Sequence, residues 1–176
     1  MKKLLLPLLI SLSTVALAET PKGFFGIELM KNAKQYATDV QLAGKTKNTE
    51  TISGYNNILI NPPEINPYFE NYSLAVNDRN IIHEIKGFQY HTDLQVCLRE
   101  VKTIKNKLEK KYTFKLLESE ITSPGFKAYR NYIRFSNSNY LVVQCNDYTN
   151  GDVYALLAYT HDKLNDAKNK FYNSGI

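Results

Sequence analysis

Residues 139–161 read NYLVVQCNDYTNGDVYALLAYTH, and this stretch decides the fold. Two runs rich in β-branched and aromatic residues flank Asn150-Gly151, the pair that most readily takes the two positive φ angles of a type I′ turn. The sequence therefore predicts a β-hairpin with a two-residue turn. Such a turn fixes the register, so Cys145 is expected opposite Leu156.

One face of this hairpin is expected to lie in the core. By alternation along the two strands, that face carries Leu141, Val143, Cys145, Tyr154, Leu156 and Ala158. The chain has two cysteines, so the thiol in the middle of this face has one available partner, Cys97. The hairpin is therefore predicted to be bonded to the element that carries Cys97.

The clearest helix is predicted over residues 92–112. Thr92 and Gln95 fit a capping box at its start, and Lys110-Lys111 lie at its end, where the helix dipole favours cations. Apolar side chains recur at helical spacing along one stripe: Leu94, Cys97, Leu98, Val101, Ile104, Leu108 and Tyr112. Because the core faces of a helix and a hairpin are expected to meet, a Cys97–Cys145 disulfide is predicted.

The remaining pattern predicts further strands and two more helices. Helical spacing covers Ile27 to Val40, strand-like runs follow at 51–60, 71–76, 79–86, 114–120 and 129–135, and Asp162 caps a last helix. The predicted fold class is α+β: an antiparallel sheet of about five to seven strands packed against the long helix, with an N-terminal helix and a short C-terminal helix. Residues 19–176 are expected to form one domain, or two weak helix-plus-hairpin repeats at about 24–90 and 91–176.

This order of elements, with the entry Phe25-Gly26-Ile27-x-Leu29, resembles small exported bacterial domains built from a helix and an antiparallel sheet. The outer-membrane assembly lipoprotein fold and the β-lactamase-inhibitor fold are of this kind. The resemblance is one of arrangement. It implies an α+β domain and transfers no site residue.

The first eighteen residues are typical of a cleaved signal peptide. Lys2-Lys3 precede the mostly apolar run Leu4–Leu17, and Ala16-Leu17-Ala18 offers the small residues that signal peptidase reads. An uncleaved anchor would need roughly 20 apolar residues, and this run is shorter. Cleavage is expected after Ala18, which gives a periplasmic or secreted protein in a compartment where disulfides persist.

Enzyme signatures are not found in the sequence. It lacks Gly-x-Ser-x-Gly, His-Glu-x-x-His, a Walker loop and Cys-x-x-Cys, and His83, His91 and His161 are scattered. We therefore predict no catalytic residues, no cofactor and no metal. The net charge of +5 is too small to indicate a nucleic-acid partner. A small periplasmic hydrolase with a site in Thr51–Tyr72 and no recognisable motif is kept as the alternative.

The second face of the hairpin is unusually apolar for a solvent face. Alternation places Tyr140, Val142, Gln144, Leu157 and Tyr159 on it, with Tyr132 and Arg134 nearby on the preceding strand. Either the C-terminal helix or the proline-rich loop covers this face, or the face binds a partner. Tyr and Arg are enriched at binding hot spots, so Tyr132, Arg134, Tyr140 and Tyr159 are the candidate partner-binding residues.

The polar face of the long helix is a second candidate surface. It carries Arg99, Lys102, Lys105, Lys107, Lys110 and Lys111, and it could dock an anionic envelope component or simply be solvated. Together these features favour an exported, non-enzymatic binding protein of the inhibitor, immunity or envelope-accessory kind, which recognises a protein or an envelope component.

Overall fold

The structure is a computed structural model that describes residues 20–47 and 54–173. The predicted signal peptide, residues 1–18, lies outside these residues, as do residues 51–53 of a predicted strand. The strands are β1 (Gly23–Phe24), β2 (Ile27–Glu28), β3 (Thr46–Lys47), β4 (Tyr55–Leu59), β5 (Asn71–Asn77), β6 (Ile82–His91), β7 (Leu117–Ser123), β8 (Phe126–Arg134), β9 (Tyr140–Tyr148) and β10 (Val153–Thr160). The helices are η1 (Ala33–Gln35), α1 (Asp39–Ala43), α2 (Leu94–Tyr112) and α3 (Asp162–Asn173).

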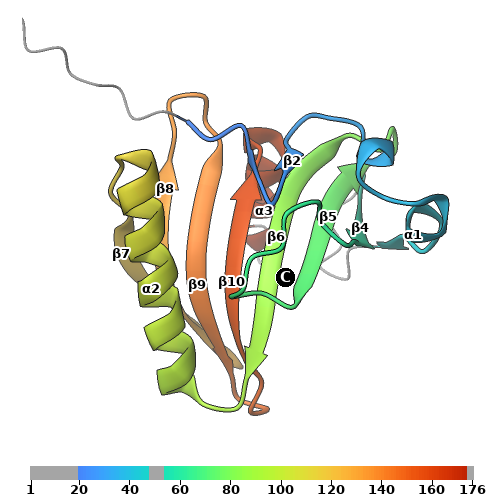
Figure 1. Cartoon of the computed structure of the whole chain (residues 1–176). Coiled ribbons are helices and arrows are strands. Elements are labelled where there is room, and N and C mark those ends of the chain that lie inside the picture. The colour runs from blue at the N-terminus through green and yellow to red at the C-terminus, as the bar shows by residue number, and fades with distance from the viewer. Residues whose placement is uncertain (1–19, 48–53, 174–176) are drawn as a thin grey trace, which may run out of the picture.

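An antiparallel sheet forms the body of the molecule (Figure 1). Its order is β3-β4-β5-β6-β10-β9-β8-β7, so two meanders, β3–β6 and β7–β10, meet where their last strands pair. The predicted α+β class, the long helix and the C-terminal helix are confirmed. The sheet has eight strands, of which β3 is two residues long, so its seven longer strands match the upper end of the expected number.

The central hairpin differs from the prediction by one residue. Three residues, Thr149 to Gly151, separate Tyr148 from Asp152, and the Tyr148 N–H donates to the Asp152 carbonyl at 2.9 Å. Gly151 alone takes a positive φ, +92°, whereas a type I′ turn would need one at Asn150 also. Cys145 therefore lies opposite Ala155, not Leu156, and every β10 side chain is on the face opposite to the one expected.

The long helix begins two residues later than predicted. Asp93 caps it, because its Oδ1 accepts from the Gln95 N–H at 2.6 Å and from the Val96 N–H at 3.1 Å. Its buried stripe faces β9 and β10 and is Cys97, Val101, Ile104 and Leu108. The structure brings together the two cysteines of the predicted disulfide: the sulfur atoms of Cys97 and Cys145 are 2.09 Å apart, across 48 positions of sequence.

The continuous helix predicted over Ile27–Val40 is wrong. Residues Phe25 and Gly26 turn the chain at positive φ, Met30 has a φ of 63°, and Thr38 makes a capping box with Gln41 that starts the short α1. These turns break the helical path that the apolar spacing suggested. Ile27 and Ala33 are nevertheless buried, together with Phe24, Phe25 and Leu29, and pack in the core, whereas Met30 and Val40 are exposed.

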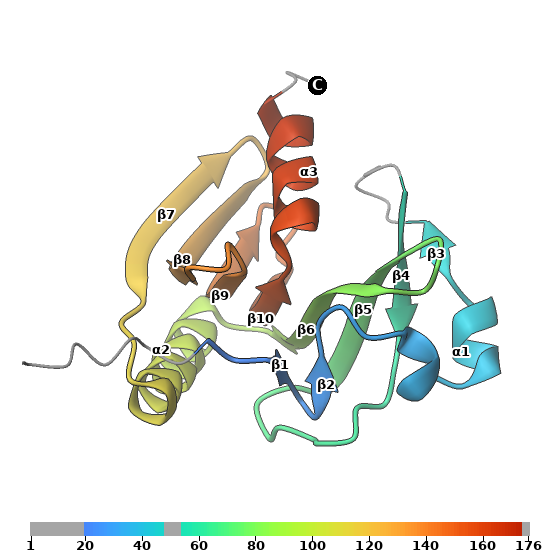
Figure 2. The same cartoon turned by 90° about the horizontal axis from the view of Figure 1, so that it is seen from above.

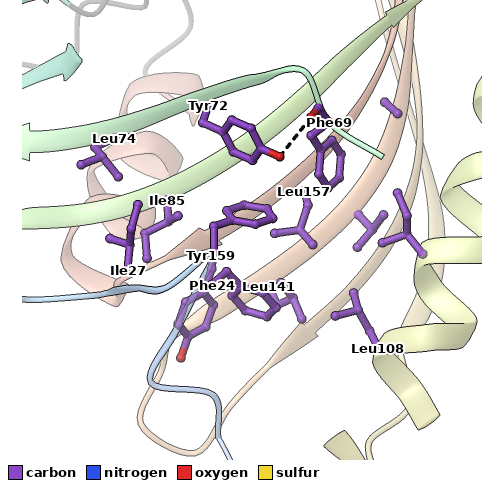
Figure 3. Packing of buried hydrophobic residues seen from close by; sticks show 14 of the residues in the cluster. Phe24, Ile27, Phe69, Tyr72, Leu74, Ile85, Leu108, Leu141, Leu157 and Tyr159 are labelled. Atoms are coloured by element: carbon purple, nitrogen blue, oxygen red, sulfur yellow. Dashed lines mark hydrogen bonds between the residues drawn. The ribbon is translucent and has the colours of Figure 1, made fainter. Parts of the chain in front are cut away.

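The core lies between the sheet and two coverings on the same face, α2 and the N-terminal segment 20–36. Phe24 packs against Tyr159 with ring centres 5.2 Å apart, and Phe25 packs against Tyr72 at 5.0 Å. Figure 3 shows the rings of Phe24, Tyr72 and Tyr159 among Leu74, Ile85, Leu108, Leu141 and Leu157. The Tyr72 hydroxyl donates to the Phe69 carbonyl at 3.0 Å. Figure 2 shows α3 on the opposite side of the sheet from α2.

Candidate partner-binding surface

We call the side of the sheet opposite α2 the far face. Because Cys145 is bonded to α2, its neighbours Gln144 and Asn146 point to the far face. Helix α3 covers one end of this face, where Leu164 is buried beside Ala75. The main strand contact of α3 is with β6, and the far-face side chains of β8 and β9 are partly buried by one another, among them Val142 and Asn146. Figure 2 shows where α3 lies on this side of the sheet.

Arg130 is the centre of one cluster on the far face. Its guanidinium carbon lies 5.3 Å from the ring centre of Tyr132 and 5.7 Å from that of Tyr140, and these rings are 5.8 Å apart. One Nη atom donates to the Tyr140 hydroxyl, while the buried Nε makes no hydrogen bond within the described chain. Burial lowers the pKa of Arg130, and the neighbouring Tyr132 partly opposes that effect. Arg134, directly opposite Tyr140 on β9, is exposed.

An aromatic row crosses the far face nearer the β9–β10 turn. Neighbouring ring centres are between 5.4 and 6.0 Å apart along the series Phe88, Tyr90, Tyr154, Tyr148 and Phe126. The row passes over β6, β10, β9 and β8 in turn, and Tyr90 has 57% of its surface exposed. It extends the Arg130 cluster into a larger surface of half-buried aromatic side chains.

Three of the four sequence-predicted binding residues, Tyr132, Arg134 and Tyr140, come together here. Tyr159 does not: the one-residue shift in register places it in the core, fully buried. Its hydroxyl accepts from Asn139 Nδ2 at 2.9 Å and donates to the Pro21 carbonyl at 2.5 Å. Burial raises the pKa of Tyr159, against a lowering by the Asn139 hydrogen bond.

The sequence reasoning missed Arg130 and the aromatic row. Alternation along β8 gives a signal for Arg130, which lies two residues before Tyr132 on the same face. The row required knowledge that β6 pairs with β10, because that pairing sets Tyr90 opposite Tyr154. Neither strand carries a local signal for that distant partner.

A buried carboxylate fixes α3 to the far face. Glu84 is 1% exposed; its Oε2 lies 2.6 Å from Lys168 Nζ on α3 and accepts from Thr160 Oγ1 at 2.7 Å. Its Oε1 lies 3.0 Å from Lys86 Nζ. Burial alone would raise the pKa of Glu84, but the two lysines and the hydrogen bonds from Lys168 and Thr160 hold it far below its ordinary value.

Two of the three histidines meet beside this carboxylate. The rings of His83 and His161 are 5.4 Å apart, whereas His91 lies 3.4 Å from Glu100 on α2. Burial, and then the neighbouring His161, lower the pKa of His83. Among residues 20–47 and 54–173, no three His, Cys, Asp or Glu side chains are placed to hold a metal ion.

A cleft of about 860 Å³ opens on the α2 side, between α2, the proline-rich loop and the N-terminal segment. Lys107 and Lys111 line it from the helix, and Lys107 Nζ lies 4.7 Å from the ring centre of Tyr68 across it. The described part of Thr51–Tyr72, the region suggested for a hydrolase, contributes Glu64, Ile65, Asn66 and Tyr68. Within the described lining, the hydroxyl, thiol and imidazole groups are limited to Thr20, Tyr68 and Tyr112.

Part of the positive charge on the basic face of α2 is paired with acids. Lys105 contacts Glu118 at 3.0 Å and Glu109 at 3.8 Å, so part of that charge is offset.

The described helices include none both long and apolar enough to cross a membrane. Comparison of the chain with protein-family models, with curated proteins and with solved structures finds no match.

Proposed function

We propose that this protein is an exported, non-enzymatic binding protein that recognises a protein or an envelope component through its far face. The observation that carries the proposal is the combination of the Arg130 cluster with the aromatic row, on a part of the sheet that α3 leaves open. Tyr and Arg dominate binding hot spots, because they bury a large area and keep a polar group that can pair.

Export is supported by the signal-like start of the chain and by the Cys97–Cys145 disulfide. Disulfides persist in oxidising compartments and are rare in the bacterial cytosol. A periplasmic or secreted location therefore belongs to the same proposal.

The test is capture from an envelope extract by the immobilised chain beginning at Glu19. The variant Tyr90→Ala with Tyr132→Ala removes one ring from the row and one from the cluster, and capture should fall at least tenfold, since each anchor contributes about 2 kcal/mol. Lys102→Ala with Lys110→Ala, two exposed side chains on α2, is the matched control and should capture normally. Circular dichroism must show both variants folded; equal capture by the folded tyrosine variant would refute the proposal.

The alternative, a small hydrolase, is favoured by one observation, the cleft beside α2, whose volume is in the range of small-molecule sites. Its described polar lining is mainly lysine and glutamate, with hydroxyl groups from Thr20, Tyr68 and Tyr112. A nucleophile would come from one of these side chains or from a bound water. Turnover of a chromogenic ester, amide or phosphate that Glu64→Gln abolishes would favour this alternative over the binding protein.

A further inference from the structure

The charge of Arg130 has no acidic partner among the described residues. Its neighbours across the sheet are Ser119 on β7 and Gln144 on β9, and along β8 the same face carries Ala128 and Tyr132. The acids nearest in β7, Glu118 and Glu120, point to the other face and contact Lys105 and Lys127. Arg130 is therefore half-buried beside two tyrosine rings, the Tyr140 hydroxyl and the uncharged side chains of Ser119 and Gln144, and no acid in the described part of the chain forms an ion pair with it.

A guanidinium in such a position is usually matched by a carboxylate, because taking a charge out of water costs several kcal/mol. Here the two tyrosine rings supply the compensation, through contacts with their negative faces. The rings and the Tyr140 hydroxyl also restrict the side chain, so little of its freedom is lost when an anion binds. The site is thus preorganised for an anion that it does not itself provide.

The number of arginines at this site indicates whether the anion belongs to a membrane surface or to a polypeptide. Arg130 and Arg134 lie four residues apart on one face, roughly 13 Å along the strand, and Lys86 farther along the sheet already contacts Glu84. Two arginines are too few for an anionic membrane, since lipid-binding clusters carry about four to eight basic residues. The adjoining aromatic row instead offers the apolar contact area that a folded or extended polypeptide uses.

We propose that Arg130, packed against the rings of Tyr132 and Tyr140 without an acidic partner in the described part of the chain, binds a glutamate or aspartate carboxylate in an acidic segment of the partner protein. Arg134 provides the second, exposed cation for that segment. This inference rests on the proposed function, and it assigns the chemistry of the partner at the same surface.

The experiment is an NMR titration of the folded, disulfide-bonded chain with a blocked hexaglutamate peptide, which follows the Arg130 Nε–H signal. The hexaglutamate peptide should shift this signal saturably, and a blocked hexaglutamine peptide should leave it in place. In Arg130→Lys, which keeps the charge but loses the planar fork and the Nε–H signal, binding is followed through the backbone amide signals of β8, and affinity for hexaglutamate should fall about tenfold. The matched control Arg99→Lys, at an exposed α2 position, should bind hexaglutamate like the native chain.

Three outcomes would overturn the inference: no shift with hexaglutamate, tighter binding of inorganic phosphate, or tighter binding of phosphatidylglycerol vesicles. The wild-type titration decides the matter even where a variant fails to fold. Capture of an envelope protein that survives Arg130→Lys but is lost in Tyr90→Ala with Tyr132→Ala would overturn the carboxylate assignment alone. Capture unaffected by either variant would overturn the proposed function as well.

Discussion

Glu84 should be one of the most sensitive positions for stability at neutral pH. Its carboxylate is 1% exposed and contacts two lysines and one hydroxyl, at 2.6, 3.0 and 2.7 Å. Glu84→Gln keeps the size of the side chain but leaves Lys168 and Lys86 without their anion. Breaking a buried pair on one side costs about 3 to 5 kcal/mol, and the lower figure applies here because both lysines are partly exposed and can turn toward water.

The Glu84 carboxylate also makes the free energy of unfolding depend on pH. The pKa of Glu84 is lowered in the folded protein from an ordinary value of 4.5. Its stabilisation is therefore fully present above about pH 5 and is lost as the pH falls below 4.5 toward the lower folded-state pKa. Each pH unit below 4.5 should remove about 1.4 kcal/mol of the difference between the native chain and Glu84→Gln.

Urea unfolding at pH 7 and pH 3.5, with the disulfide intact, measures both effects. Glu84→Gln should lose about 3 kcal/mol at pH 7 and about 1.4 kcal/mol less than that at pH 3.5. Glu118→Gln is the matched control, because this exposed carboxylate also contacts a lysine but should be worth under about 1 kcal/mol. A loss at Glu84 no greater than at Glu118, or a difference that does not shrink in acid, would refute the reasoning.

Three further predictions follow from features described above. Replacing both Cys97 and Cys145 by serine should lower the free energy of unfolding by about 4 kcal/mol, and two free thiols in non-reducing mass spectrometry of exported protein would contradict the disulfide. Tyr159→Phe should cost about 2 kcal/mol in urea unfolding, since it leaves Asn139 without its buried acceptor; a loss below 0.5 kcal/mol would mean that this hydrogen bond is dispensable. N-terminal sequencing of protein from cells should find Glu19 first, and a chain that still begins with Met1 would refute cleavage.

Patterns that depend on neighbours in sequence predicted much of the fold. The stripe through Cys97 located α2, and alternation put Cys145 on the core face of β9, so the disulfide could be predicted from the two patterns. The turn could not be settled in the same way, because Asn150-Gly151 suits both a two-residue and a three-residue loop. That single residue decided whether Tyr159 lies in the core or on the far face.

The candidate site was predictable only where its residues lie on strands that are neighbours in the sequence. Tyr132, Arg134 and Tyr140 follow from alternation in two consecutive strands. In the N-terminal segment, by contrast, the local pattern gave the wrong structure. Its apolar residues recur at helical spacing, but positive φ angles at Phe25 and Met30 direct the chain through turns. Tertiary packing of Phe24 and Ile27 against the sheet decided its path, and no local pattern reports such packing.

The meeting of β6 and β10 also sets the order in which the chain can fold. The β5–β6, β7–β8, β8–β9 and β9–β10 hairpins close over short loops, whereas the β6–β10 ladder must bring together segments separated by a helix and three strands. Loop-closure entropy makes such distant pairing slow. The disulfide joins α2 to β9, and both of these elements follow β6 in the chain. Oxidation therefore restricts the unfolded chain between Cys97 and Cys145 but does not bring β6 closer to β10. We expect the pairing of β6 with β10 to be the slow step of refolding.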